Sequence, residues 1–85
     1  MKLLYFAWIR ERTGVHEETW SLPAGVTTLA GLVDALSARG PGFAAAFADL
    51  SRIRAAVNQE TAGMDAVISD RDEVAFFPPM TGGRA

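Results

Sequence analysis

The sequence predicts an α+β fold in which one mixed sheet carries a single main helix across one of its faces. Apolar, strand-like segments lie near both ends of the chain, and the most clearly marked helix lies between them. The chain has 85 residues, of which 49% are hydrophobic and 21% charged, so it can bury one small core. We therefore expect a single folded domain over residues 1–77, followed by a C-terminal tail over residues 78–85.

The first expected element is a strand over residues 3–9, because this segment is apolar, rich in aromatic residues and too short for a stable helix. One side of an exposed sheet normally carries polar residues. Here both alternating faces are apolar: Leu3, Tyr5, Ala7 and Ile9 on one, and Leu4, Phe6 and Trp8 on the other. After a turn over residues 13–16, residues 17–22 are expected to form a second, more exposed strand, which makes a hairpin with the first.

The main helix is expected to begin after Thr27 or Thr28, because either hydroxyl can cap a helix N-terminus. Its apolar residues follow at the spacing of one buried stripe: Leu29, Leu32, Val33 and Leu36. The expected end has Arg39 in the last turn, Gly40 in a left-handed position and Pro41 beyond it.

The rest of the domain is expected to hold a short helix, two or three strands and a turn. The expected segments are a short helix through Phe43, Phe47 and Leu50, a strand over 54–57 ending at Asn58, a short strand near 66–68, a turn over 69–72 and a last strand over 73–77. Pro78 and Pro79 stop the last strand, since proline has no N–H for a strand ladder. Residues 80–85 show no periodicity and are expected to form a flexible tail.

Charge and composition exclude several classes of function. The formal net charge of −2 is too balanced for a nucleic-acid-binding surface. With no cysteine and one histidine, the sequence offers neither a thiolate nor a His-rich metal site. The apolar run over residues 3–9 is far shorter than the ~20 residues of a membrane span, and the N-terminus lacks the pattern of a secretory signal. We expect a cytoplasmic protein that binds no metal, nucleic acid or membrane.

The remaining polar candidates are expected to be structural. His16 lies in a predicted turn without a nucleophile pattern around it, so a surface position is expected. An acidic cluster near the last strand lacks the ligand set of a calcium loop and is expected to be a solvated turn. Its members are Asp70, Asp72 and Glu73, with Asp65 nearby. Because no acid–base pair or nucleophile is recognisable, a free-standing enzyme is the weakest functional candidate.

The C-terminal segment is unusual for a chain that ends soon after its last strand. Pro78 and Pro79 restrict the backbone, so the residues after them are expected to leave the domain in a defined direction. Gly82 and Gly83 have no Cβ atom, so their backbone can enter a slot too narrow for other residues. From these residues alone, a projecting arm presented to another protein and a frayed terminus are equally open.

Three segments of the chain resemble one known family. Residues 72–83 (Asp-Glu-Val-Ala-Phe-Phe-Pro-Pro-Met-Thr-Gly-Gly) resemble the C-terminal signature of the small subunit of molybdopterin synthase, a ubiquitin-like sulfur carrier with a β-grasp fold. Residues 55–59 (Ala-Ala-Val-Asn-Gln) resemble its internal segment, and residues 6–11 resemble its first strand, which ends in an Arg-Glu pair. The resemblance covers essentially the whole chain. The Phe-Phe-Pro-Pro lead-in is more specific than the Gly-Gly pair, which several carriers share.

The resemblance implies a carrier without catalytic groups of its own. In this family an ATP-dependent activating enzyme, with a ubiquitin-activating-type fold, adenylates the terminal glycine, here Gly83. A sulfur donor protein then converts the adenylate to a thiocarboxylate. The tail enters the large synthase subunit, where its sulfur is transferred to cyclic pyranopterin monophosphate, and two transfers complete the dithiolene of molybdopterin. The inserted tail residues are Pro78, Pro79, Met80, Thr81 and Gly82. The resemblance also implies a heterotetramer of two small and two large subunits, and no permanently bound cofactor, with ATP used by the activating enzyme.

One feature departs from the family pattern. The family ends at the second glycine, whereas Arg84 and Ala85 follow Gly83 in this sequence. Gly83 has no free carboxylate while it is bonded to Arg84, so we expect these two residues to be absent from the active form. Removal by a peptidase, a different mature end and an inactive variant are the alternatives.

The doubly apolar first strand suggests a partner interface. In the β-grasp fold the two terminal strands are neighbours, so aromatic side chains on the face away from the helix can form one apolar patch beside the tail. The residues expected at this interface are Leu4, Phe6, Trp8, Arg10 and Phe77. The alternative is that one aromatic side chain packs under a loop and that Arg10 is an ordinary surface residue.

Two other functions remain open at this point. One is a sulfur carrier of another pathway, such as thiamine or cysteine synthesis, against which the Phe-Phe-Pro-Pro lead-in argues. The other is a ubiquitin-like interaction module that is never activated, which the residues after Gly83 favour. Only a carrier would form an acyl-adenylate with ATP and the activating enzyme.

Overall fold

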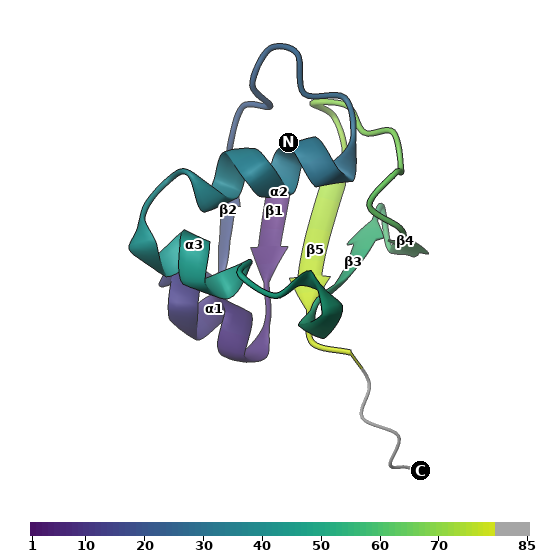
Figure 1. The fold of residues 1–85 in the computed structure, drawn as a ribbon. Helices are drawn as coiled ribbons and strands as arrows, with labels where there is room; N and C mark the ends of the chain where they lie inside the picture. The colour runs from purple at the N-terminus through teal and green to yellow at the C-terminus, as the bar shows by residue number, and fades with distance from the viewer. Residues whose placement is uncertain (80–85) are drawn as a thin grey trace, which may run out of the picture.

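The computed structural model describes residues 1–79, which form a five-stranded mixed sheet with three α-helices and one 3₁₀ helix (Figure 1). The strands are β1 (Lys2–Tyr5), β2 (Glu17–Thr19), β3 (Arg54–Val57), β4 (Glu60–Ala62) and β5 (Glu73–Phe77). The helices are α1 (Ala7–Thr13), α2 (Leu29–Ser37), α3 (Pro41–Ala46) and the 3₁₀ helix η1 (Leu50–Arg52). The expected strands over 54–57 and 73–77 are confirmed.

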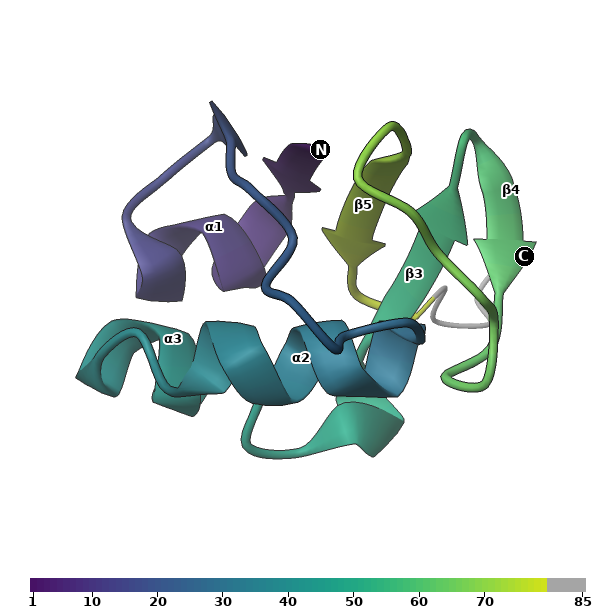
Figure 2. The same cartoon turned by 90° about the horizontal axis from the view of Figure 1, so that it is seen from above.

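The two terminal strands lie side by side at the centre of the sheet. The strand order is β2-β1-β5-β3-β4, in which β1 and β5 are parallel and the other neighbours are antiparallel. Viewed along the sheet, α2 and α3 lie on one side of the strands (Figure 2). This arrangement confirms the predicted α+β class and the β-grasp fold.

The core lies between the inner face of the sheet and α2. Leu3 of β1 is paired with Val74 of β5, and both are fully buried. The predicted stripe on α2 is buried in this layer. The predicted cap is also formed, because Thr28 Oγ1 accepts a hydrogen bond from the backbone N–H of Gly31 at 3.2 Å. Each large apolar side chain moved from water into this layer stabilises the fold by about 1.5–3 kcal/mol. The stripe consists of Leu29, Leu32, Val33 and Leu36.

The prediction of one strand over residues 3–9 is wrong. β1 ends at Tyr5, Phe6 remains extended, and Ala7 with φ 54° turns the chain into α1. The helix brings Ile9 into the core, where it is fully buried. Gly14, in the left-handed conformation with φ 79°, ends α1 and donates its N–H to the carbonyl of Arg10 at 2.8 Å. An apolar segment that looked uniform in sequence is therefore divided between a strand and a helix.

The connection between the first two strands also differs from the expectation. β1 and β2 are antiparallel neighbours, but α1 lies between them in the chain, and the expected turn near 13–16 follows this helix, with a turn at Gly14 and a bend at His16 before β2. β2 covers residues 17–19, and the rest of the predicted strand belongs to a loop. Within residues 1–79 no helix is long and apolar enough to cross a membrane; the longest, α2, has nine residues.

Gly40 does not take the left-handed position predicted for it. Its backbone is extended, with φ 158° and ψ 174°, and it is the residue that precedes α3. Pro41 then occupies the first turn of α3, where a missing N–H costs nothing. The Gly-Pro pair that was expected only to end α2 therefore also begins the next helix.

The expected strand near residues 66–68 is not formed. Val67 makes a single bridge with Thr28, and the fourth strand is β4 instead. β3 and β4 are joined through Asn58 and Gln59, whose positive φ angles of 51° and 72° suit a tight two-residue hairpin. The sequence signal for this hairpin is weak because the turn contains no glycine.

Candidate functional site

The face of the sheet opposite α2 carries a short apolar strip. Leu4 and Ala56 are both paired in register with Ala75, so the three side chains lie on the same face. Phe77 follows two residues after Ala75 and therefore projects to the same side. All four side chains are half-buried. In the described part of the chain, α2 and α3 lie on the other side of the strands (Figure 2).

β1 and β5 end together at one edge of this face, which we call the tail end of the sheet. Being parallel, they finish at the same level, β1 at Tyr5 and β5 at Phe77. The N–H of Phe6 donates to the carbonyl of Phe76 at 3.0 Å, and the Phe6 side chain is 46% exposed. The tertiary structure thus brings three of the predicted interface residues to one place: Leu4, Phe6 and Phe77.

The other two predicted interface residues lie on α1. Trp8 is half-buried with the guanidinium of Arg52 over its ring, 5.2 Å from the centroid. It does not share a strand face with Leu4 and Phe6, so the alternation that grouped it with them was wrong. Arg10 lies one helical turn after Phe6, and its Nη1 is 3.4 Å from Nδ1 of His16. His16 is exposed, as predicted.

Only the first two residues of the predicted tail, Pro78 and Pro79, belong to the described part of the chain. Pro78 and Pro79 follow β5 directly and are half-buried. Met80, Thr81, Gly82 and Gly83, together with Arg84 and Ala85, lie outside the described residues. Their predicted roles in insertion and sulfur transfer stay predictions.

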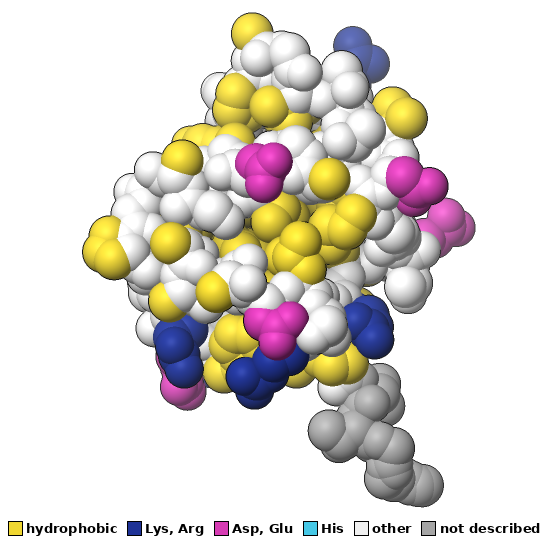
Figure 3. Space-filling model, viewed as in Figure 1, with side chains coloured by type: hydrophobic (Ala, Val, Ile, Leu, Met, Phe, Trp, Pro, Cys, Tyr) yellow, Lys and Arg dark blue, Asp and Glu magenta, His cyan; other side chains and the backbone are white. Residues whose placement is uncertain are grey.

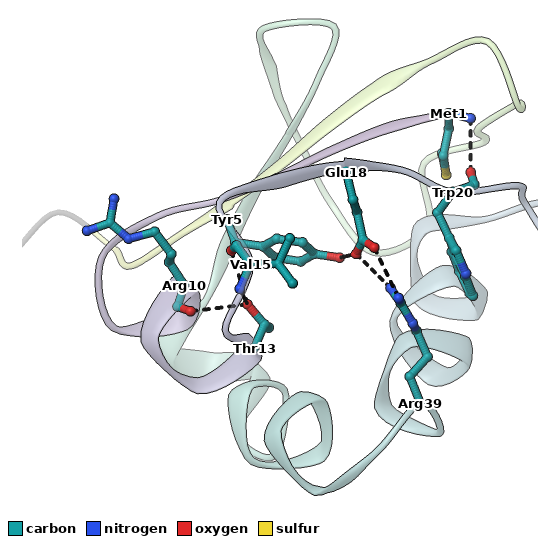
Figure 4. A network of polar contacts seen from close by, with 8 residues as sticks. All are labelled: Met1, Tyr5, Arg10, Thr13, Val15, Glu18, Trp20 and Arg39. Atoms are coloured by element: carbon teal, nitrogen blue, oxygen red, sulfur yellow. Dashed lines mark hydrogen bonds and ion pairs between the residues drawn. The ribbon is translucent and has the colours of Figure 1, made fainter.

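Tyr5, Glu18 and Arg39 form a polar network that was not predicted from the sequence. The hydroxyl of Tyr5, a residue at the tail end of β1, donates to Glu18 Oε2 at 2.8 Å (Figure 4). Arg39 Nη1 and Nη2 donate to the two Glu18 oxygens at 2.6 Å and 3.0 Å. The hydrogen bonds from Arg39 hold the pKa of Glu18 below its usual value, and burial raises the pKa of the Tyr5 phenol.

Two aromatic rings hold the Arg39 guanidinium in place. Its central carbon is 4.8 Å from the ring centroid of Trp20 and 4.4 Å from that of Phe43. Each such contact contributes about 0.5–1 kcal/mol at an exposed position. Glu18 and Arg39 are 21 residues apart, and no spacing rule connects a strand residue with a loop residue at that separation. The network therefore carries no local sequence signal.

The acidic cluster near β5 organises turns, as predicted. Asp70 Oδ1 accepts from the N-terminal amino group at 3.2 Å and from the N–H of Leu22 at 2.7 Å. The Leu22 hydrogen bond, followed by that of the amino group, holds the pKa of Asp70 below its usual value. Asp72 accepts from Asn58 and from the N–H of Ser69. Over residues 1–79, no three His, Cys, Asp or Glu side chains are grouped in a way that would hold a metal ion.

Comparison with known proteins agrees with this architecture. Residues 3–83 match the ThiS family. The molybdopterin synthase sulfur carrier subunit of Escherichia coli (strain K12) is 39% identical over 83 residues, covering 98% of this chain and 99% of that protein. The human molybdopterin synthase sulfur carrier subunit is 37% identical over 87 residues, covering 98% and 93%. The crystal structure of SAMP1 from Haloferax volcanii has a TM-score of 0.75 at 28% identity, covering 98% of each chain.

These similarities extend over nearly the full length of the sequence. They include the three segments quoted for the family resemblance, the central pair of parallel strands and the residues that follow β5. With a family match over residues 3–83 and relatives of 37–39% identity along the same stretch, the chain belongs to the ThiS family.

Proposed function

We propose that this chain is the sulfur carrier subunit of a molybdopterin synthase and that Gly83 carries the sulfur. The observation that carries the proposal is the placement of β5. It is a central strand that ends at Phe77 beside the exposed side chain of Phe6, and all residues of the Pro-Pro-Met-Thr-Gly-Gly segment follow it. Relatives named as molybdopterin synthase sulfur carrier subunits support the same conclusion.

The proposed reaction uses the backbone of the carrier instead of its side chains. A partner enzyme joins the Gly83 carboxylate to the AMP part of ATP and releases pyrophosphate. Sulfur at the oxidation level of hydrosulfide, delivered by a donor protein, then attacks the acyl carbon and displaces AMP, which leaves a thiocarboxylate. In the large synthase subunit the thiocarboxylate sulfur bonds to cyclic pyranopterin monophosphate in place of an oxygen, and water then cleaves the acyl–sulfur bond, which returns the Gly83 carboxylate. The large subunit would supply positioning and exclude water, since the polar groups of the described core are engaged with each other.

The carrier would supply a docking surface at the tail end of the sheet. Leu4, Phe6 and Phe77 present apolar area there, and Arg10 and Trp8 lie on the adjacent helix. Contiguous exposed apolar area of this kind is typical of protein interfaces. Docking at this surface would direct the residues after Pro79 into the partner. The assembly we propose is a heterotetramer of two small and two large subunits.

The proposed chemistry requires cleavage of the bond between Gly83 and Arg84, because an amide carbonyl cannot be adenylated as a carboxylate can. We therefore propose that the active form ends at Gly83. Mass spectrometry of the protein purified from its native host tests this directly. An active form that retains Arg84 and Ala85 would contradict the role of Gly83.

The reaction itself is tested with two purified forms, one ending at Gly83 and one ending at Ala85. Each is incubated with ATP, the activating enzyme and a sulfur donor, and then weighed by mass spectrometry. We expect replacement of one oxygen by sulfur only in the form ending at Gly83. If neither form is adenylated, the chain is an interaction module. If the thiocarboxylate forms but the large subunit of molybdopterin synthase does not accept it, the chain is a carrier for another pathway.

A further inference from the structure

A cleft at the tail end of the sheet, on the side of the helices, is lined by charged residues that have no role in the proposed carrier reaction. It lies between α1 on one side and α3 with η1 on the other, and has a volume of about 300 Å³. The small side chains of Ala45 and Ala48 leave the space open. The complete lining is Trp8, Arg12, Ala45, Ala48, Asp49 and Arg52.

The main hydrogen-bonding groups of this cleft are two arginine side chains that form no ion pair in the described part of the chain. Arg12 and Arg52 are exposed, and within residues 1–79 neither makes an ion pair. The cleft also contains one carboxylate, Asp49, whose Oδ1 accepts from Ser51 Oγ at 2.6 Å and from the Ser51 N–H at 3.1 Å, so two cations face a single anion. Two guanidinium groups with free N–H donors favour a ligand that is anionic and rich in acceptors.

Arg52 is held in a defined position by the aromatic ring beneath it. Its guanidinium carbon is 5.2 Å from the Trp8 ring centroid, so the charged plane is supported on one face. Trp8 and Arg12 are four residues apart on α1 and therefore lie on the same side of that helix. A preorganised guanidinium loses less conformational entropy on binding than a free one, which favours recognition of a carboxylate.

The cleft is part of a basic region at the tail end of the molecule. Arg54 is paired in register with Phe77 at the end of β5, and Arg10 is on α1, the helix that follows the end of β1 and carries Arg12. Glu11 and Asp49 are the acidic residues on the same elements. Asp70, Asp72 and Glu73 lie at the opposite end of the sheet, where β5 begins. Figure 3 shows Lys and Arg side chains gathered at the lower end of the visible face, which is the tail end in Figure 1.

We propose that this cleft binds an Asp or Glu side chain of the large subunit, at the rim of the channel that receives the tail. The proposal rests on the proposed function and adds a specific electrostatic contact to it. Tryptophan and arginine are the residue types most enriched at the energetic centres of protein interfaces. The cleft also lies at the end of the domain where β5 finishes. Both the charge and the position of the cleft favour an acidic segment of the protein that takes up the tail.

Charge reversal with a matched control tests the proposal. Arg12→Glu and Arg52→Glu are each made in the form ending at Gly83, with Arg71→Glu, at the opposite end of the sheet, as a control of identical charge change. Affinity for the purified large subunit is measured by calorimetry at low and high salt. We expect each cleft variant to weaken binding about tenfold or more and to reduce the salt dependence, and Arg71→Glu to change the Kd by less than about twofold.

The outcomes separate this proposal from the proposed function. If the parent chain binds the large subunit and the cleft variants bind equally well, the cleft contact is wrong while the carrier function stands. If the parent chain neither binds nor becomes adenylated, the proposed function is wrong. Titration of the parent chain with inorganic phosphate alone tests whether the cleft binds a small free anion instead of a protein side chain. Saturable phosphate binding that is lost in Arg52→Glu, combined with unchanged binding of the large subunit, would assign the cleft to a small anion and overturn the proposal.

A second measurement distinguishes a direct contact from long-range attraction. A photo-crosslinking amino acid is placed at position 48, because Ala48 is exposed and lines the cleft. We expect it to crosslink to a large-subunit segment that contains Asp or Glu. The same amino acid at position 61 is the control, since Thr61 is exposed on β4 at the far edge of the sheet. Crosslinks of equal yield from both positions, or none from position 48, would contradict the proposal. Circular dichroism checks that every variant is folded.

Discussion

Arg39 binds both carboxylate oxygens of Glu18, at 2.6 Å and 3.0 Å, while two aromatic rings enclose its guanidinium. The pair joins β2, an edge strand of three residues, to the loop between α2 and α3. The same carboxylate accepts a hydrogen bond from the hydroxyl of Tyr5, which is on β1. A short edge strand has few ladder hydrogen bonds of its own, so this network is expected to keep β2 attached to the helical layer.

Replacement of Arg39 by alanine should destabilise the fold by about 1–3 kcal/mol, because it leaves a largely buried carboxylate without its cation. The Glu18 side chain is 17% exposed. Urea unfolding followed by circular dichroism measures the change. Lys2→Ala is the control: Lys2 of β1 pairs at 3.7 Å with Glu17 of β2, the strand that also carries Glu18, but both side chains are at least half exposed. Its expected cost is below about 1 kcal/mol. Equal losses for the two variants would contradict the role assigned to Arg39.

The stability of the protein should fall on the acid side in a way that depends on Glu18. Its pKa is lowered from the ordinary value of 4.5, so folding favours the ionised form. The stabilisation is complete above pH 4.5 and is lost as the pH falls through the lower pKa of the folded state.

At alkaline pH, stability should depend on Tyr5. The pKa of its phenol is raised above the ordinary value of 10.0, so stability should fall above pH 10, where the phenol ionises in the unfolded chain but not in the folded one.

The acid effect is measured as the free energy of unfolding between about pH 3 and pH 6. Glu18→Gln should unfold with a flatter pH profile than the parent, since one linked carboxylate has been removed. Asp70→Asn gives a comparison, because the pKa of Asp70 is also lowered and its hydrogen bonds hold a different region. Superimposable profiles for Glu18→Gln and the parent would refute the assignment.

Substitution of Gly42 by alanine should be strongly destabilising. A Cβ atom at this position of α3 would collide with the backbone carbonyl oxygen of Arg12 in α1, and a carbonyl cannot rotate away as a side chain can. We expect a loss of about 1–3 kcal/mol despite the better helix propensity of alanine. The cleft between α1 and α3 should widen, so binding of the large subunit should weaken as well.

Gly31→Ala is the matched control for this prediction. In α2 the new Cβ would meet only two side chains outside the helix backbone at close range, Val26 at 3.2 Å and Thr28 at 3.6 Å. Small rotations can relieve these contacts, so the expected change is within about 1 kcal/mol of the parent. Thermal unfolding of both variants under one condition gives the comparison. A Gly42→Ala variant as stable as Gly31→Ala would show that α1 and α3 separate at little cost.

Replacement of Phe77 by aspartate should weaken binding of the large subunit about tenfold or more and leave the domain folded. The side chain is half-buried on the face away from α2, and the charge would lie beside Arg54, its partner in register on β3. Thr61→Asp, which places a charge on the same face at the far edge, is the control. Calorimetry with the purified large subunit gives the affinities, and undiminished affinity of Phe77→Asp would remove this residue from the interface.

Much of the fold was predictable because its signals are local. The α2 cap and stripe lie within nine consecutive residues, and each signal acts on its immediate neighbours. β5 was equally clear, since alternation and two following prolines define both its faces and its end. The division between β1 and α1 had no such signal. Seven apolar residues satisfy a strand pattern, and the chain leaves the sheet only because Ala7 adopts φ 54° and Ile9 can then reach the core.

The sequence by itself determined the β-grasp order of elements, the main helix and the C-terminal segment whose composition suggests a carrier. Only the tertiary structure decided which distant side chains meet. It pairs Glu18 with Arg39, stacks Arg52 over Trp8 and brings Phe6 beside the end of β5. The physical reason is that helix caps and apolar periodicity act between neighbours in the chain, whereas a contact across many residues exists only after the sheet order has been set.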